Sequence, residues 1–130
     1  MDTNESIKYW IELAEYDFET AIVMNDTKRF LYVGFMCHQT IEKIFKAYYV
    51  KKREEIPPFT HSLIKIAKFA AFYEELTEVQ KDTIDALEPL NIESRYPTHK
   101  ERLLRDLNNE FCTNLIKKTE DLLTWIKEKL

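Results

Sequence analysis

The sequence has very little glycine and proline, with one glycine and four prolines in 130 residues. Turns between β-strands depend on these residues, so their scarcity favours a few long helices over a sheet. Cysteine is also scarce. Cys37 and Cys112 form no CxxC pair and lie among apolar residues in helical patterns. They are therefore expected to be buried free thiols in a reducing compartment.

Long apolar runs are missing as well. No segment approaches the ~18 apolar residues of a membrane span, and the acidic N-terminus MDTNESIKYW lacks the apolar stretch of a signal peptide. We therefore expect a cytoplasmic protein with no membrane contact. The 130 residues, 45% of them hydrophobic, are enough for one domain with its own core, covering residues 1–130.

Common catalytic and cofactor patterns are missing too. The chain has no GxSxG and no glycine-rich phosphate loop, which excludes a P-loop and a dinucleotide fingerprint. Its three histidines and two cysteines show no ligand spacing, so neither a metal nor a cofactor is expected. Cys37 and His38 are adjacent and diverge by about 100° around a helix, so they cannot pair. We expect Cys37 in the core and His38 half-buried.

Apolar residues recur at three- and four-residue steps, which predicts an all-α fold. The expected helices cover about 5–24, 27–52, 61–73, 77–90 and 105–129. Two long helices joined by a short turn pack antiparallel, so the expected architecture is a single up-and-down bundle of about five helices.

Local signals refine the expected helix ends. Thr3 or Asn4, Thr60 and Thr77 are the expected N-caps of the first, third and fourth helices, and Asp26 or Thr27 that of the second. Pro89 should kink or break the fourth helix. Gly34 lies inside the second helix, where it costs about 1 kcal/mol against alanine but allows another helix to approach.

The net charge of −4 is unevenly distributed along the chain. Residues 1–27 and 54–94 are mainly acidic, whereas 28–53 and 95–105 are mainly basic. If the two basic segments meet in space, they form a local anion site within an acidic protein.

One face of the second helix carries Gln39, Lys43 and Lys46 at helical spacing. Two interpretations are open. The face is solvated, with an ordinary ion pair between Glu42 and Lys46. Alternatively, Lys43 and Lys46 supply charge for a phosphate and Arg95 adds a bidentate guanidinium.

Four segments together resemble the HEPN family. They are W-x3-A-x2-D-x3-A from Trp10, FMCHQTIEKIFKAYY (35–49), P-x2-TH-x-L (57–63) and NIESRYP (91–97). The resemblance implies a bundle of about five helices that forms a homodimer. It also implies nucleotide binding and a nucleotidyltransferase-fold partner, in paired modules similar to toxin and antitoxin.

Many HEPN members are metal-independent ribonucleases whose motif is Arg, four to six residues, then His. Here three residues separate Arg95 from His99, and Pro97 lies between them. No catalytic residue is therefore expected, and RYP resembles the nucleotide-binding branch. The family's polar matches are Asp17, Gln39, Glu42, Lys43, Lys46, His61 and Arg95. The expected nucleotide or anion site is Gln39, Lys43, Lys46, His61 and Arg95.

Three functions follow as hypotheses. The first is a nucleotide- or anion-binding and protein-interaction module that acts with a nucleotidyltransferase-type protein. The second is a ribonuclease that cleaves RNA with a degenerate Arg95/His99 site. The third is a structural dimerisation scaffold, in which Asp17 pairs with Lys43 or Arg95 to hold the helices together.

Overall fold

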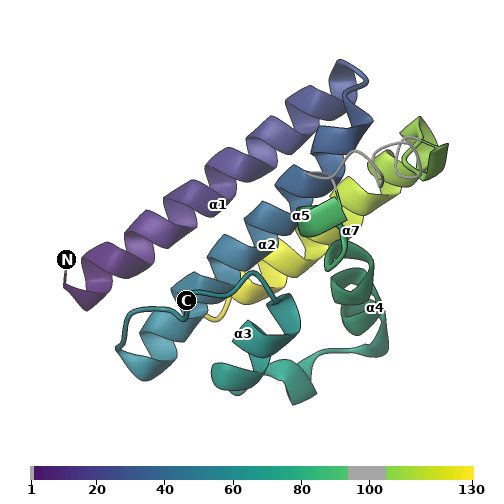
Figure 1. Cartoon of the computed structure of the whole chain (residues 1–130). Coiled ribbons are helices and arrows are strands. Elements are labelled where there is room, and N and C mark those ends of the chain that lie inside the picture. The colour runs from purple at the N-terminus through teal and green to yellow at the C-terminus, as the bar shows by residue number, and fades with distance from the viewer. Residues whose placement is uncertain (1, 94–104) are drawn as a thin grey trace.

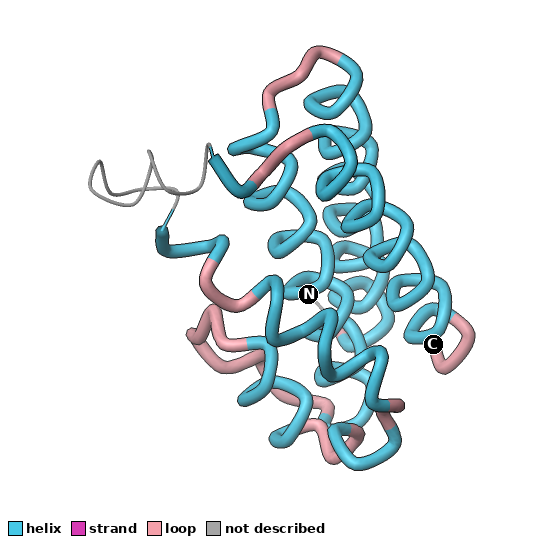
Figure 2. The backbone as a smooth tube through the Cα atoms, turned by 90° about the vertical axis from the view of Figure 1, so that its right-hand side faces the viewer, coloured by secondary structure: helices cyan, strands magenta, loops and turns pink. Residues whose placement is uncertain are grey.

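Two long helices form the centre of the structure, a computed structural model that describes residues 2–93 and 105–130. Helix α1 (Thr3–Asp26) and helix α2 (Phe30–Arg53) run antiparallel beside each other, joined by a short turn (Figure 1). No strand occurs in the part of the chain that the structure describes (Figure 2). The expected all-α bundle and its antiparallel long pair are confirmed.

Helix α2 is the central element. It contacts α1 and each of the remaining α-helices described, which are α3 (Leu63–Phe69), α4 (Glu78–Leu87), α5 (Leu90–Glu93) and α7 (Asn109–Lys127). A short 3-10 turn, η1 (Tyr73–Glu75), links α3 to α4. Because helices surround it, α2 is buried on most of its circumference, including several polar side chains.

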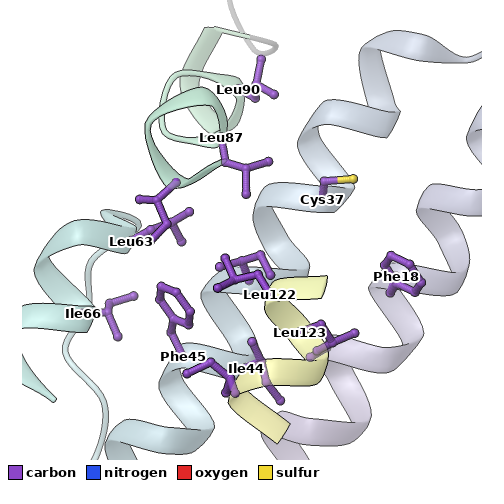
Figure 3. Close-up of a cluster of buried hydrophobic side chains, with 14 of the residues drawn as sticks. Phe18, Cys37, Ile44, Phe45, Leu63, Ile66, Leu87, Leu90, Leu122 and Leu123 are labelled. Atoms are coloured by element: carbon purple, nitrogen blue, oxygen red, sulfur yellow. The ribbon is translucent and has the colours of Figure 1, made fainter. Parts of the chain in front are cut away.

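The hydrophobic core draws side chains from all of these α-helices (Figure 3). Phe45 of α2 meets Phe72 edge to face, with ring centroids 4.8 Å apart. The predicted close approach at Gly34 is also confirmed. A Cβ at that position would lie 3.0 Å from Leu90 Cδ1, so the glycine makes room for α5.

Two sequence signals placed helix ends correctly. Thr77 caps α4 in a reciprocal capping box, in which its side chain accepts from Gln80 N and the Gln80 side chain accepts from Thr77 N. Pro89 separates α4 from α5, as expected.

The other caps were assigned wrongly by one or more residues. Asp2 rather than Thr3 or Asn4 caps α1, and α2 follows Arg29 without a side-chain cap. Ser62 caps α3, because Thr60 Oγ1 instead accepts from the backbone N–H of Ser62. Several residues with side-chain oxygens precede each of these helices. The sequence alone does not show which of them caps the helix.

The third and last helices are shorter than predicted. Helix α3 ends at Phe69, and the chain then turns through Ala71, a residue with positive φ. Helix α7 begins at Asn109, where the Asn108 side chain accepts from Phe111 N. None of the described helices has the length and apolar character needed to cross a membrane.

Candidate functional site

The predicted site residues on α2 lie on successive turns of that helix. Gln39, Lys43 and Lys46 share one side of α2, and His61 approaches it from the loop between α2 and α3. Arg95 lies outside the described residues, so its predicted place beside these side chains stays a prediction.

Lys43 is bound to the neighbouring long helix. Its Nζ donates a hydrogen bond to Oδ2 of Asp17 on α1. Asp17 is buried, whereas the Lys43 side chain retains 21% of its surface exposed. Of the two partners considered for Asp17, Lys43 is therefore the one seen here, and the pair links α1 to α2 by a charge-assisted bond.

Glu42 is the centre of a second set of contacts. Lys46 Nζ donates to Glu42 Oε2 at 3.0 Å, and His61 Nδ1 lies 3.0 Å from Glu42 Oε1. Both carboxylate oxygens are therefore engaged. The ammonium of Lys46 also lies 5.6 Å from the ring centroid of Trp10, which adds a cation–π attraction.

Of the two interpretations of this side of α2, the one with a solvated Glu42–Lys46 ion pair is wrong. Only 4% of Glu42 and 8% of Lys46 is exposed. The helical spacing is as predicted, but His61 from the following loop lies against Glu42. Burial of the two charges carries a desolvation cost, which their mutual attraction and the contact with His61 offset.

His38 lies next to this pair and is fully buried, not half-buried as expected. Its Nδ1 is 3.8 Å from Glu42 Oε1, and its Nε2 is 3.9 Å from Glu88 Oε1. Neither ring nitrogen has a hydrogen-bond partner among the described residues. Burial lowers the pKa of His38 to about 4, although the charge of Glu42 acts in the opposite direction. His38 is therefore neutral at pH 7.

Two residues of this region, Glu88 and Asn91, were not selected from the sequence. Glu88 accepts from Ser62 Oγ at 3.0 Å and from the backbone N–H of Leu63 at 2.7 Å, so it fixes the start of α3. Asn91 Oδ1 accepts from Gln39 Nε2 at 3.0 Å. The sequence signal available for Glu88 was its place directly before Pro89, where a helix ends. We refer to Glu42, Lys46, His38, His61 and Glu88 as the Glu42 cluster.

A pocket of about 390 Å³ opens beside the Glu42 cluster. Its lining residues are Phe59, Thr60, His61, Ser62, Glu88 and Asn91. The side chain of His61 is 58% exposed and Phe59 is 99% exposed. The pocket thus combines hydroxyl, amide, imidazole and carboxylate groups with an uncovered aromatic ring.

The described residues offer little for nucleophilic or metal chemistry. Burial raises the pKa of Cys37 to about 12 and that of Cys112 to about 11, so both thiols stay protonated at neutral pH. No group of three or more ligand side chains among residues 2–93 and 105–130 could hold a metal ion. Arg95 and His99, the ribonuclease candidates, lie outside these ranges.

Comparison with known proteins supports the fold and identifies the family. The crystal structure of TT1696 from Thermus thermophilus superposes with a TM-score of 0.81 over 95% of this chain and 98% of that chain, at 17% sequence identity. No curated protein is a significant match to the sequence. The model of the HEPN domain matches residues 7–130. Because this match spans nearly the whole chain, the protein belongs to the HEPN domain family.

Proposed function

We propose that this protein is a nucleotide- or anion-binding and protein-interaction module. In this proposal it forms a homodimer and acts with a nucleotidyltransferase-fold partner in a toxin–antitoxin-like pair. The observation that carries the ligand class is the link of two predicted site residues, His61 and Gln39, to the pocket. His61 lines that pocket, and Gln39 is joined to it through Asn91. Membership of the HEPN family supports the same conclusion.

The site residues have different roles in this proposal. Lys43 and His61 keep accessible surface and contact the anionic part of the ligand. Lys46 is almost fully buried and acts indirectly. Its ammonium binds the Glu42 carboxylate, which in turn contacts His61. Arg95 supplies a guanidinium fork to the phosphate. Phe59 offers its uncovered ring to the base.

The charges impose a condition on binding. Lys43 is paired with Asp17, and Glu42 faces both Lys46 and His61. A phosphate at Lys43 therefore competes with the Asp17 carboxylate. Binding becomes favourable when a further cation joins, and this is the role assigned to Arg95. We accordingly expect Arg95 to contribute more to affinity than Lys46.

Thermal unfolding and calorimetry with ATP, GTP and inorganic phosphate test this proposal. A nucleotide at 100 times its dissociation constant should stabilise the protein by about 2.7 kcal/mol. Lys43→Met and Arg95→Met should weaken nucleotide binding. Lys65→Met should not, since Lys65 is exposed on α3 and does not line the pocket.

Two other outcomes would replace the proposal. If no nucleotide or phosphate shifts the unfolding transition, the remaining function is that of a structural scaffold. If the purified protein cleaves single-stranded RNA and His99→Ala abolishes the cleavage, the protein is a ribonuclease despite its shortened Arg95–His99 spacing.

A further inference from the structure

One flank of α1, beside the side that packs on the core, carries a row of uncharged side chains. Its members recur at alternating steps of three and four and are Tyr9, Leu13, Tyr16, Thr20 and Val23. Tyr9, Tyr16 and Val23 are 45%, 68% and 55% exposed. The packed side of α1 consists of other residues, including Ala14, Phe18 and Ala21. The row therefore contributes little to the core.

A row of carboxylates runs beside these side chains. Glu5, Glu12, Glu19 and Asp26 are spaced seven residues apart, and all four are exposed. Within residues 2–93 and 105–130, only Glu12 has an ion-pair partner, at 3.9 Å from Lys8. Both side chains of that pair are mostly in water, where such a pair contributes little. We call the two rows together the outer face of α1.

The pattern of the outer face is that of a helix which packs against a second helix. Alternating steps of three and four place apolar side chains in one seam, and charges beside the seam select the partner. The rings of Tyr9 and Tyr16 alone leave on the order of 200 Å² in water. A stable interface needs about 800 Å² from each partner, so further surface must join in.

We propose that the outer face of α1 binds a basic amphipathic helix of a partner protein. The apolar side of that helix covers the seam at Tyr9, Tyr16 and Val23, and its lysine or arginine row faces the four carboxylates. This interaction does not depend on nucleotide binding, because the residues of the Glu42 cluster lie on α2, at the C-terminal end of α4 and in the α2–α3 loop.

The charges disfavour a second copy of this chain on the same face. In an antiparallel pair of α1 helices, equivalent edges meet, so each carboxylate row would oppose its own copy. In a parallel pair, the row would meet the opposite edge of α1. Two cations of α2 reach α1, and both are already engaged: Lys43 is bound to Asp17, and Lys46 is bound to Glu42 and lies over the Trp10 ring. The same negative row repels nucleic acid and anionic lipid.

Two synthetic helical peptides test the proposal with the full-length protein. Both carry the same Leu/Ile seam over about three heptads, and the row beside it is lysine in one and glutamate in the other. Fluorescence anisotropy should show at least about ten-fold tighter binding of the lysine peptide at about 50 mM salt. Raising the salt to about 300 mM should reduce this preference several-fold.

Matched variants show whether the outer face is the binding site. Tyr16→Ser should weaken binding of the lysine peptide about ten-fold, and Glu12→Gln with Glu19→Gln about five-fold. The controls remove similar groups elsewhere and should change affinity less than about two-fold. They are Phe69→Ser on α3 and Glu74→Gln with Glu78→Gln.

Two results would overturn the proposal. One is equal binding of both peptides, or equal losses in the control variants. The other is a concentration-dependent dimer in sedimentation that Tyr16→Ser dissolves, because the occupant of the outer face would then be a second copy.

Discussion

The Glu42 cluster and the outer face of α1 share a sequence pattern but differ in the burial of their charged side chains. In both, charged side chains recur at helical spacing on a long helix. On α2 the charges are covered and bound to one another, as in the pair of Glu42 and Lys46. On α1, Glu5, Glu19 and Asp26 remain in water. The element that packs next to the helix decides which outcome occurs.

This difference has energetic consequences. Breaking a buried ion pair leaves an uncompensated charge and costs about 3–5 kcal/mol, whereas an exposed pair contributes about 0–1 kcal/mol. Substitutions in the Glu42 cluster should therefore lower the free energy of unfolding. Substitutions on the outer face of α1 should change only the affinity for a partner.

The largest effect is expected from Lys46→Met. It removes the ammonium that binds Glu42 Oε2 and leaves a buried carboxylate with His61 as its remaining partner. The free energy of unfolding, measured by urea denaturation at pH 7, should fall by about 3 kcal/mol. Lys8→Met, which breaks the exposed pair with Glu12, is the matched control and should cost less than about 0.5 kcal/mol.

The double variant Glu42→Leu with Lys46→Met sharpens this test. It removes both charges together, so part of the lost stability should return. If Lys46→Met and Lys8→Met lower the free energy of unfolding equally, the buried ion pair contributes no more than the exposed one. The proposed difference between the two regions is then wrong.

The second effect concerns pH and His38. Its pKa is lowered from 6.5 to about 4 in the folded protein, mainly by burial. Between these values the unfolded chain binds more protons, so stability falls as the pH falls. From pH 7 to pH 4.5, wild type should lose about 2 kcal/mol more than His38→Gln. Glu42 and Glu88 face the side chain at this position in both proteins, so His38→Gln is the matched reference. If the free energy of unfolding of wild type and of His38→Gln falls in parallel with pH, this prediction is wrong.

Much of the fold could be predicted from the sequence because its signals are local. The apolar periodicity of α1 and α2, the capping box at Thr77 and the break at Pro89 all depend on residues close together in the chain. The assignment of Thr60 as a cap failed because two neighbouring oxygens competed for the same role, and Ser62 is the one that caps α3. Only the three-dimensional geometry distinguishes them.

The candidate site was predicted less completely. The spacing of Gln39, Lys43 and Lys46 correctly placed them on one side of α2. The sequence also offered both ion pairs, Glu42 with Lys46 and Asp17 with Lys43 or Arg95. It could not show that the Glu42–Lys46 pair is buried, because this burial depends on elements packed around α2, such as the loop that carries His61. Glu88 follows Ser62 by 26 positions and Asn91 follows Gln39 by 52, so these two contacts depend on tertiary packing.

A smaller effect is expected at the loop that covers the Glu42 cluster. Ser62 caps α3 and also donates to Glu88. Ser62→Ala should lower the free energy of unfolding by about 1 kcal/mol, and Thr60→Ala, which removes one acceptor of the same loop, by less. Urea denaturation of both variants measures the difference. A larger loss for Thr60→Ala would mean that the Ser62 cap does not fix this loop.

The smallest effect is expected on the outer face of α1. Tyr16→Ser and the pair Glu12→Gln with Glu19→Gln alter exposed groups that contribute little to the core. The free energy of unfolding of the isolated protein should change by less than about 0.5 kcal/mol in each case. Phe18→Ala, on the packed side of the same helix, should cost about 3–5 kcal/mol. Helix α1 therefore offers its own control, since Tyr16 and Phe18 are two residues apart and point to different sides. A large loss for Tyr16→Ser in the isolated protein would mean that the row supports the fold, and its exposed tyrosines would then need no partner to explain them.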